Sequence, residues 1–97
     1  MREIIRVDNL ERFEPLECPI ECHLDFILDP PKTVKREVPR GDIDNFCKGP
    51  LDSLNGILWK DDMQIVRLTA NKRFKQDGET SGIRIRWREC RQVAPAV

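Results

Sequence analysis

The chain has 97 residues, of which 39% are hydrophobic and 35% charged, and its 17 basic side chains balance 17 acidic ones. These values exclude a wholly disordered chain and favour one small globular domain, residues 1–97, whose modest core makes oligomerisation an expectation. No segment approaches the ~20 apolar residues of a membrane span. Charges interrupt the N-terminus where a signal peptide needs an apolar run, so we expect a cytoplasmic protein.

The charges are unevenly distributed along the chain. Residues 1–31 carry three basic and eight acidic side chains, whereas residues 32–97 carry fourteen basic and nine acidic ones. Such segregation is what a polyanion-binding face on a neutral protein requires. The same charges also fit an ordinary solvated surface.

The first clear element is a strand that starts near Glu17; residues 1–15 before it fit either a short strand or a helical turn. Apolar residues then alternate with polar ones, the period of a strand with one buried face: Cys18, Ile20, Cys22, Leu24 and Phe26. His23 falls on the opposite face from the cysteines, which argues against a zinc site. In a cytosolic chain we expect the four cysteines to be reduced.

A polar loop at residues 32–41 follows the strand, and four of its residues are basic: Lys32, Lys35, Arg36 and Arg40. It lies directly before an acidic motif, Asp-x-Asp-Asn at residues 42–45. A basic loop in this position is suited to binding phosphates, although many exposed loops have the same composition.

The principal helix is expected after that motif. Apolar residues recur at helical spacing: Cys47, Leu51, Leu54 and Leu58. Asp44 is suited to the N-cap and Asn55-Gly56 to the C-terminal stop. Because Pro50 has no N–H to donate, the helix either begins nearer Lys48 or is kinked at the proline.

Two strands are expected in the last third of the chain. Val66, Leu68 and Ala70 alternate with polar residues; after a turn-forming segment, Ile83, Ile85 and Trp87 alternate with Arg84, Arg86 and Arg88. We expect an antiparallel hairpin whose arginine row, beside Arg67, Lys72, Arg73 and Lys75, forms a cationic surface. Residues 92–97 are a tail. Together, these elements predict an α+β fold with a mixed or antiparallel sheet and one principal helix.

Carboxylates are the main candidates for chemistry. Asp42 and Asp44 share one face if their segment is extended, and Asp61-Asp62 supplies a second acidic pair. Carboxylate oxygens suit Mg²⁺ or Mn²⁺, which can polarise a phosphodiester and activate water; Lys48 is placed to meet an anionic substrate. Alternatively, these residues are only a turn, an N-cap, a surface turn and a solvated lysine.

In combination, these motifs are more specific. Residues 42–66 contain Asp-x-Asp-Asn-x-x-Lys, Leu-Asp-x-Leu-Asn-Gly and Trp-Lys-Asp-Asp-x-Gln-Ile-Val in this order. The string resembles the signature of the RusA-like crossover-junction endodeoxyribonucleases, the phage- and prophage-borne Holliday-junction resolvases. The likeness covers about residues 16–88. Family members carry a further N-terminal strand and helix, so the resemblance implies a form with a shortened N-terminus.

The resemblance implies a homodimer that cuts four-way DNA junctions in recombination and repair, in a bacterial or phage-infected cell. The implied cofactor is Mg²⁺, or alternatively Mn²⁺. No small-molecule cofactor and no association with a membrane are expected. Asp42, Asp44 and Asp62 map onto the catalytic metal ligands, with Asp61 the adjacent acid, and Lys48 onto the essential lysine. Lys32, Lys35, Arg36, Arg40 and Lys48 become the candidates for DNA contacts. A non-catalytic junction-binding protein of the same fold is the competing hypothesis.

Overall fold

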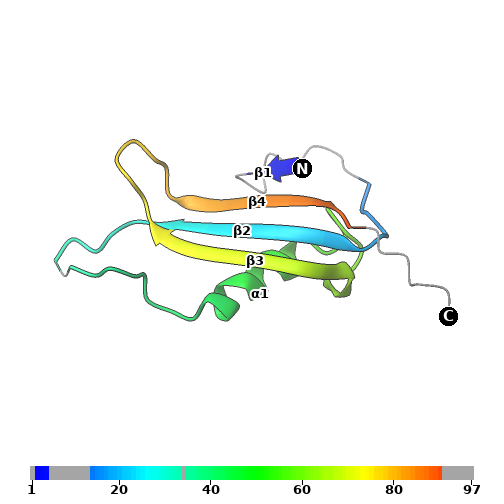
Figure 1. Cartoon of the computed structure of the whole chain (residues 1–97), viewed down its shortest axis with the longest axis horizontal. Coiled ribbons are helices and arrows are strands. Elements are labelled where there is room, and N and C mark those ends of the chain that lie inside the picture. Colours follow the sequence, from blue (N-terminus) through cyan, green and yellow to red (C-terminus); the bar gives the residue numbers. More distant parts are fainter. Residues whose placement is uncertain (1, 5–13, 34, 91–97) are drawn as a thin grey trace.

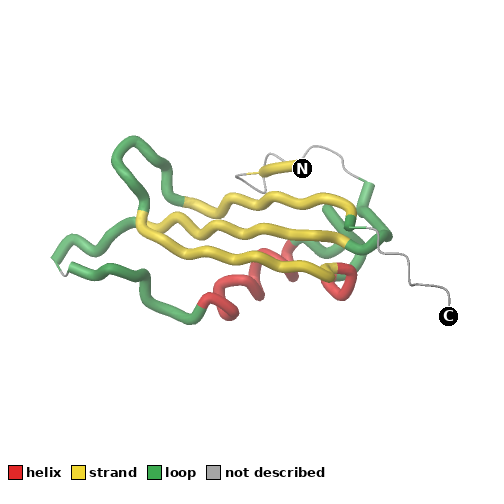
Figure 2. Tube along the Cα trace, in the orientation of Figure 1, coloured by secondary structure: helices red, strands yellow, loops and turns green. Residues whose placement is uncertain are grey.

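In the part of the chain that the structure describes, a mixed sheet carries one α-helix on one of its faces (Figures 1 and 2). The computed structural model describes residues 2–4, 14–33 and 35–90. The elements in chain order are β1 (Arg2–Ile4), β2 (Ile20–Leu28), α1 (Ile43–Ser53), the 3₁₀-helix η2 (Asp62–Gln64), β3 (Ile65–Phe74) and β4 (Gly82–Glu89). This arrangement confirms the predicted α+β class.

The strands lie in the order β1-β4-β2-β3. β2 pairs with β3 in parallel and with β4 antiparallel, so the predicted hairpin of β3 with β4 is wrong: β2 lies between them. The connection from β2 through α1 is long enough for a parallel crossover, after which β4 takes the other side of β2. Alternation along a strand indicates which face is buried, but it does not identify the neighbouring strand.

The segments predicted for the chain ends are only partly described. Arg2–Ile4 forms β1 and pairs antiparallel with β4, which fits the strand alternative for the start of residues 1–15. Residues 5–13, and the tail predicted at residues 92–97, lie outside the described residues. Within the described part of the chain, no helix is long and apolar enough to cross a membrane.

The core lies between the sheet and α1. The alternation predicted for β2 is confirmed, because Cys22 and Leu24 are fully buried while His23 between them is partly exposed. The other fully or almost fully buried side chains come from β2, from β4 and from the segment that follows α1: Ile20, Phe26, Leu54, Leu58, Trp59, Ile85 and Trp87. Burying a large apolar side chain contributes ~1.5–3 kcal/mol, so this cluster supplies the main stabilisation of the domain.

Helix α1 begins earlier than predicted. Its N-cap is Asp42, in an extended conformation, and Asp44 lies in the first turn, so the N-cap prediction for Asp44 is wrong. Both residues are suited to this end of a helix, because a negatively charged carboxylate near the N-terminus interacts favourably with the helix dipole. Pro50 lies inside the helix, which continues to Ser53; the burial of Cys47 and Leu54 on either side of the proline offsets the lost hydrogen bond.

The start of α1 is fixed to the sheet by Lys72. This side chain lies on the helix side of β3, opposite Phe26 in the register. Its Nζ donates to the carbonyl oxygens of Pro39 at 2.7 Å and Gly41 at 2.5 Å. The ring of Phe46 packs on that of Phe26, with ring centroids 5.2 Å apart. The end of the basic loop and the first turn of α1 are therefore held in one position.

Gly41 provides a test of that position. Its φ is +98°, and a Cβ added there would lie 2.9 Å from Cε2 of Phe46. We expect Gly41→Ala to lower the free energy of unfolding by about 1–3 kcal/mol, because both the backbone and the ring contact are strained. Gly49→Ala is the matched control, since that glycine lies inside α1 with no atom near the added Cβ.

Chemical denaturation measures both variants. Alanine in an exposed helix interior is favoured over glycine by about 0.5–1 kcal/mol, so Gly49→Ala should stabilise the protein while Gly41→Ala destabilises it. Equal effects of the two substitutions would contradict the assigned start of α1.

Candidate functional site

The first predicted acidic pair lies at the start of α1. The backbone of Asp42 is extended and its carbonyl accepts the N–H of Phe46 at 3.2 Å. Its side chain makes no capping hydrogen bond, and the side chains of Asp42 and Asp44 are both exposed. The segment is not extended throughout, so Asp42 and Asp44 do not share one face of a strand. Asp42 is the helix N-cap, Asp44 lies in the first turn, and both carboxylates are open to solvent.

Lys48 lies one turn after Asp44, and Asp52 one turn after Lys48. Residues four apart on a helix are neighbours on one face, so these three side chains form a row along α1. Lys48 and Asp52 are exposed. Asp52 was not among the predicted site residues; its spacing of four from Lys48 and eight from Asp44 was the signal that could have identified it.

The second acidic pair lies beyond the C-terminal end of α1. Asp61 caps η2: its carboxylate accepts the N–H of Met63 at 2.9 Å, and the side chain of Gln64 accepts the N–H of Asp61 at 2.8 Å. Gln64 also donates to the carbonyls of Leu16 at 2.7 Å and Cys18 at 3.0 Å. Asp61 thus has a structural role that fixes the start of β3.

Asp62 is partly buried beside other carboxyl groups. A hydrogen bond with Asp61, partial burial and the nearby charges of Asp61 and Asp52 raise the pKa of Asp62 above its ordinary value. Crowding of this kind disfavours the ionised form. The carboxyl neighbours of Asp62 are therefore Asp61 and Asp52, and not Asp42 and Asp44.

The structure does not bring the two predicted pairs together within one chain. Figure 1 shows α1 crossing the sheet from the end where β2 finishes to the end where β3 begins. Asp44 and Asp52 are eight residues apart on the helix, about 12 Å along its axis. Among the described residues, no group of three or more His, Cys, Asp or Glu side chains could hold a metal ion.

The chemistry of the donors still suits a magnesium ion at one end. Mg²⁺ commonly takes one or two carboxylates and completes its shell with waters and substrate phosphate oxygens. Asp42 and Asp44 meet that requirement by type and exposure, and Lys48 follows within one turn. Asp62 is not placed to join them.

The basic loop leads directly to this end of α1. Lys32, Lys35, Arg36 and Arg40 are all exposed, and the contacts of Lys72 with Pro39 and Gly41 hold the end of the loop beside Asp42. The loop cations and the helix carboxylates thus occupy one end of the protein, as the sequence predicted.

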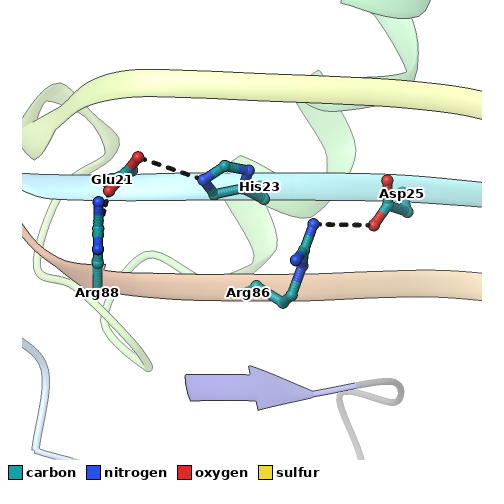
Figure 3. A network of polar contacts seen from close by, with 5 residues as sticks. All are labelled: Glu21, His23, Asp25, Arg86 and Arg88. Carbon is teal, nitrogen blue, oxygen red and sulfur yellow. Dashed lines mark hydrogen bonds and ion pairs between the residues drawn. The ribbon is translucent and has the colours of Figure 1, made fainter. Parts of the chain in front are cut away.

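The arginine row of β4 does not form the predicted cationic surface. Carboxylates of β2 face it on the side of the sheet away from α1 (Figure 3). The Nε of Arg88 donates to Glu21, which also contacts the ring of His23 at 3.4 Å, and Arg86 lies 3.5 Å from Asp25. Because β2 separates β4 from β3, acidic side chains lie between the two basic strands.

The cysteines are free in the structure, and two of them lie in the core. Burial, with a smaller effect of Cys47, raises the pKa of Cys22 to about 12. Burial also raises the pKa of Cys47. Thiols in this state are poor nucleophiles at neutral pH, so both side chains serve packing.

The fold and the site define a small α+β protein with an acidic helix start beside a basic loop. A family model described as Endodeoxyribonuclease RusA matches residues 3–86. The chain belongs to the RusA endodeoxyribonuclease family, which confirms the resemblance found in residues 42–66. The uncharacterized protein YqaN of Bacillus subtilis (strain 168) is 37% identical over 46 residues, which make up 47% of this chain and 32% of that relative. No solved structure matches the chain significantly.

The ion pair of Glu21 with Arg88 yields a prediction about pH. The hydrogen bond from Arg88 lowers the pKa of Glu21 below its ordinary value of 4.5. The ion pair therefore contributes its full stabilisation of the fold at pH values above 4.5. This contribution is lost as the pH falls through the lowered pKa. We expect Glu21→Gln to lower the melting temperature at neutral pH, and the difference from the unsubstituted protein to shrink in acid. Glu37→Gln, in the exposed loop, is the matched control and should leave the melting temperature unchanged.

Proposed function

We propose that the protein is a Mg²⁺-dependent, structure-selective endodeoxyribonuclease that resolves four-way DNA junctions in recombination and repair by hydrolysing phosphodiesters. It acts as a homodimer in the cytoplasm of a bacterial or phage-infected cell. One observation carries the proposal: in a chain of the RusA family, Asp42, Asp44 and Lys48 are exposed on the first two turns of α1, beside a fixed basic loop.

The roles of the residues follow from their positions and types. Asp42 and Asp44 would hold the metal ion. The family resemblance alone suggests Asp62, or alternatively Asp61, as a further ligand. When bound, Mg²⁺ supplies a Lewis acid for the phosphodiester and a source of hydroxide. Lys48, one turn from Asp44, offsets the negative charge that develops on the phosphate in the transition state.

Binding of the DNA backbone falls to the basic loop. Lys32, Lys35, Arg36 and Arg40 are exposed cations on one segment, and contacts of this kind give affinity that depends on salt and not on base sequence. The described part of the chain contains no ion pair that engages these four side chains. They therefore remain available to phosphates.

A second function is favoured by the separation of the acidic pairs. Because the described residues of one chain contain no three-ligand group, a non-catalytic junction-binding protein of the same fold is consistent with the structure. This protein would bind DNA through the same loop without cutting it, and its binding would need neither metal nor Asp44.

The decisive experiment is cleavage of a synthetic four-way junction with Mg²⁺ or Mn²⁺. We expect Asp44→Asn and Lys48→Ala each to lower the cleavage rate by about 10²–10³-fold, the usual effect of removing one group that stabilises transition-state charge. Binding of the junction in EDTA should change far less. Asp77→Asn, in the turn between β3 and β4, is the control and should cut at the unsubstituted rate.

One combination of results separates the two proposals. An intact junction after incubation with dimeric protein and either metal, together with metal-independent binding that Asp44→Asn leaves unchanged, would exclude the nuclease and support the binding protein. Mass determination on the same sample establishes whether the protein is a dimer.

A further inference from the structure

A groove of about 650 Å³ lies between the basic loop, the start of α1 and the end of β3. Two phenyl rings, Phe46 and Phe74, and two arginines of the loop, Arg36 and Arg40, line it together with Asp29 and Pro39. Its size is that of a small-molecule site. None of the roles proposed above uses the two rings.

The walls of the groove are held in place by contacts on several sides. Lys72 binds the carbonyl of Pro39 at 2.7 Å, and the ring of Phe46 packs against that of Phe26. Asp29 lies 3.4 Å from Nζ of Lys75 and accepts a hydrogen bond from Ser81 at 3.3 Å. Asp29, the one carboxylate among the described lining residues, is therefore paired with a cation that offsets part of its charge toward an anionic ligand.

The lining has a consistent chemical preference. Phenyl rings offer flat apolar surfaces to a planar ring, and guanidinium groups both stack on such rings and bind phosphate. A nucleotide contains both features. Arg40 is two residues from Asp42, so a base in the groove would belong to a nucleotide close to the carboxylates at the start of α1.

We propose that the groove receives one unstacked DNA base next to the phosphate that lies at Asp42 and Asp44. This inference rests on the proposed function and adds a reason for its selectivity. A base in a continuous duplex must be unstacked at a cost of a few kcal/mol before it can enter such a site, whereas an unpaired or already disrupted base enters more easily. The groove thus favours the bases at a branch point over those of a plain duplex.

The test uses the full chain and four-way junctions that carry 2-aminopurine at successive positions around the crossover, in EDTA so that no strand is cut. Fluorescence of 2-aminopurine rises when the base leaves its stack. We expect a rise at one position near the crossover, and none in a duplex of the same sequence. Phe74→Ala and Phe74→Leu should both remove the rise and weaken junction binding about tenfold, within the range measured for the loss of one aromatic stacking partner.

Two further variants make the result specific. Phe74→Trp keeps an aromatic face and should retain the fluorescence rise. Ile57→Ala removes a partly exposed apolar side chain that is not part of the groove lining and should leave both signals unchanged. Unfolding curves of all four variants establish that they are folded.

Three outcomes overturn the inference. If the junction is bound and cut but no 2-aminopurine position responds, the groove takes no base and the proposed nuclease function stands. If Phe74→Leu retains the full rise, the aromatic face is not the binding element. If no DNA is bound at all, the proposed function and this inference both fail.

Discussion

The hydrogen bonding of β2 on both of its edges is the constraint on which the rest of the structure depends. All nine of its residues pair with β3 and eight of them pair with β4, so both of its edges are occupied and its register is fixed. The inward face supplies Cys22 and Leu24 to the core. The outward face supplies Glu21 and Asp25 to the arginines of β4. The basic loop follows the end of β2 and leads to the start of α1.

The rigidity of α1 then decides which carboxylates can cooperate. At its start, Asp42 and Asp44 are exposed next to a loop rich in cations. Beyond its end, Asp62 lies against Asp61 and Asp52, which raise its pKa. Because a helix keeps its length, neither group can approach the other without a change in the chain around it. The start of α1 is therefore the end of the protein where carboxylates, a lysine and the basic loop lie together.

Much of this arrangement could be predicted from the sequence, because local patterns carry local structure. Alternation identified the buried face of β2. The helical spacing correctly selected Cys47, Leu54 and Leu58 as buried residues, but α1 ends at Ser53, so Leu54 is its C-cap and Leu58 lies beyond the helix. The pairing of β3 and β4 was wrong because alternation contains no information about neighbouring strands. The N-cap was misplaced because Asp42 and Asp44 have the same preference for a helix start, and only the extended backbone of Asp42 distinguishes them. Convergence of the acidic pairs depended on the path of the chain between them, which spacing does not specify.

The distribution of ion pairs explains how a chain with no net charge can present a basic surface at one end. The carboxylates of β2 are engaged with Arg86 and Arg88 on the open face of the sheet, and Glu79 is engaged with Arg73, which with the N–H of Gln76 lowers its pKa to about 2. These pairs neutralise cations on the open face of the sheet and near the end of β3. Among the described residues, the cations of the basic loop take part in no ion pair, so their positive charge remains beside Asp42 and Asp44. Such a field would draw an anionic ligand toward the start of α1, where an isolated pair of carboxylates would otherwise repel it.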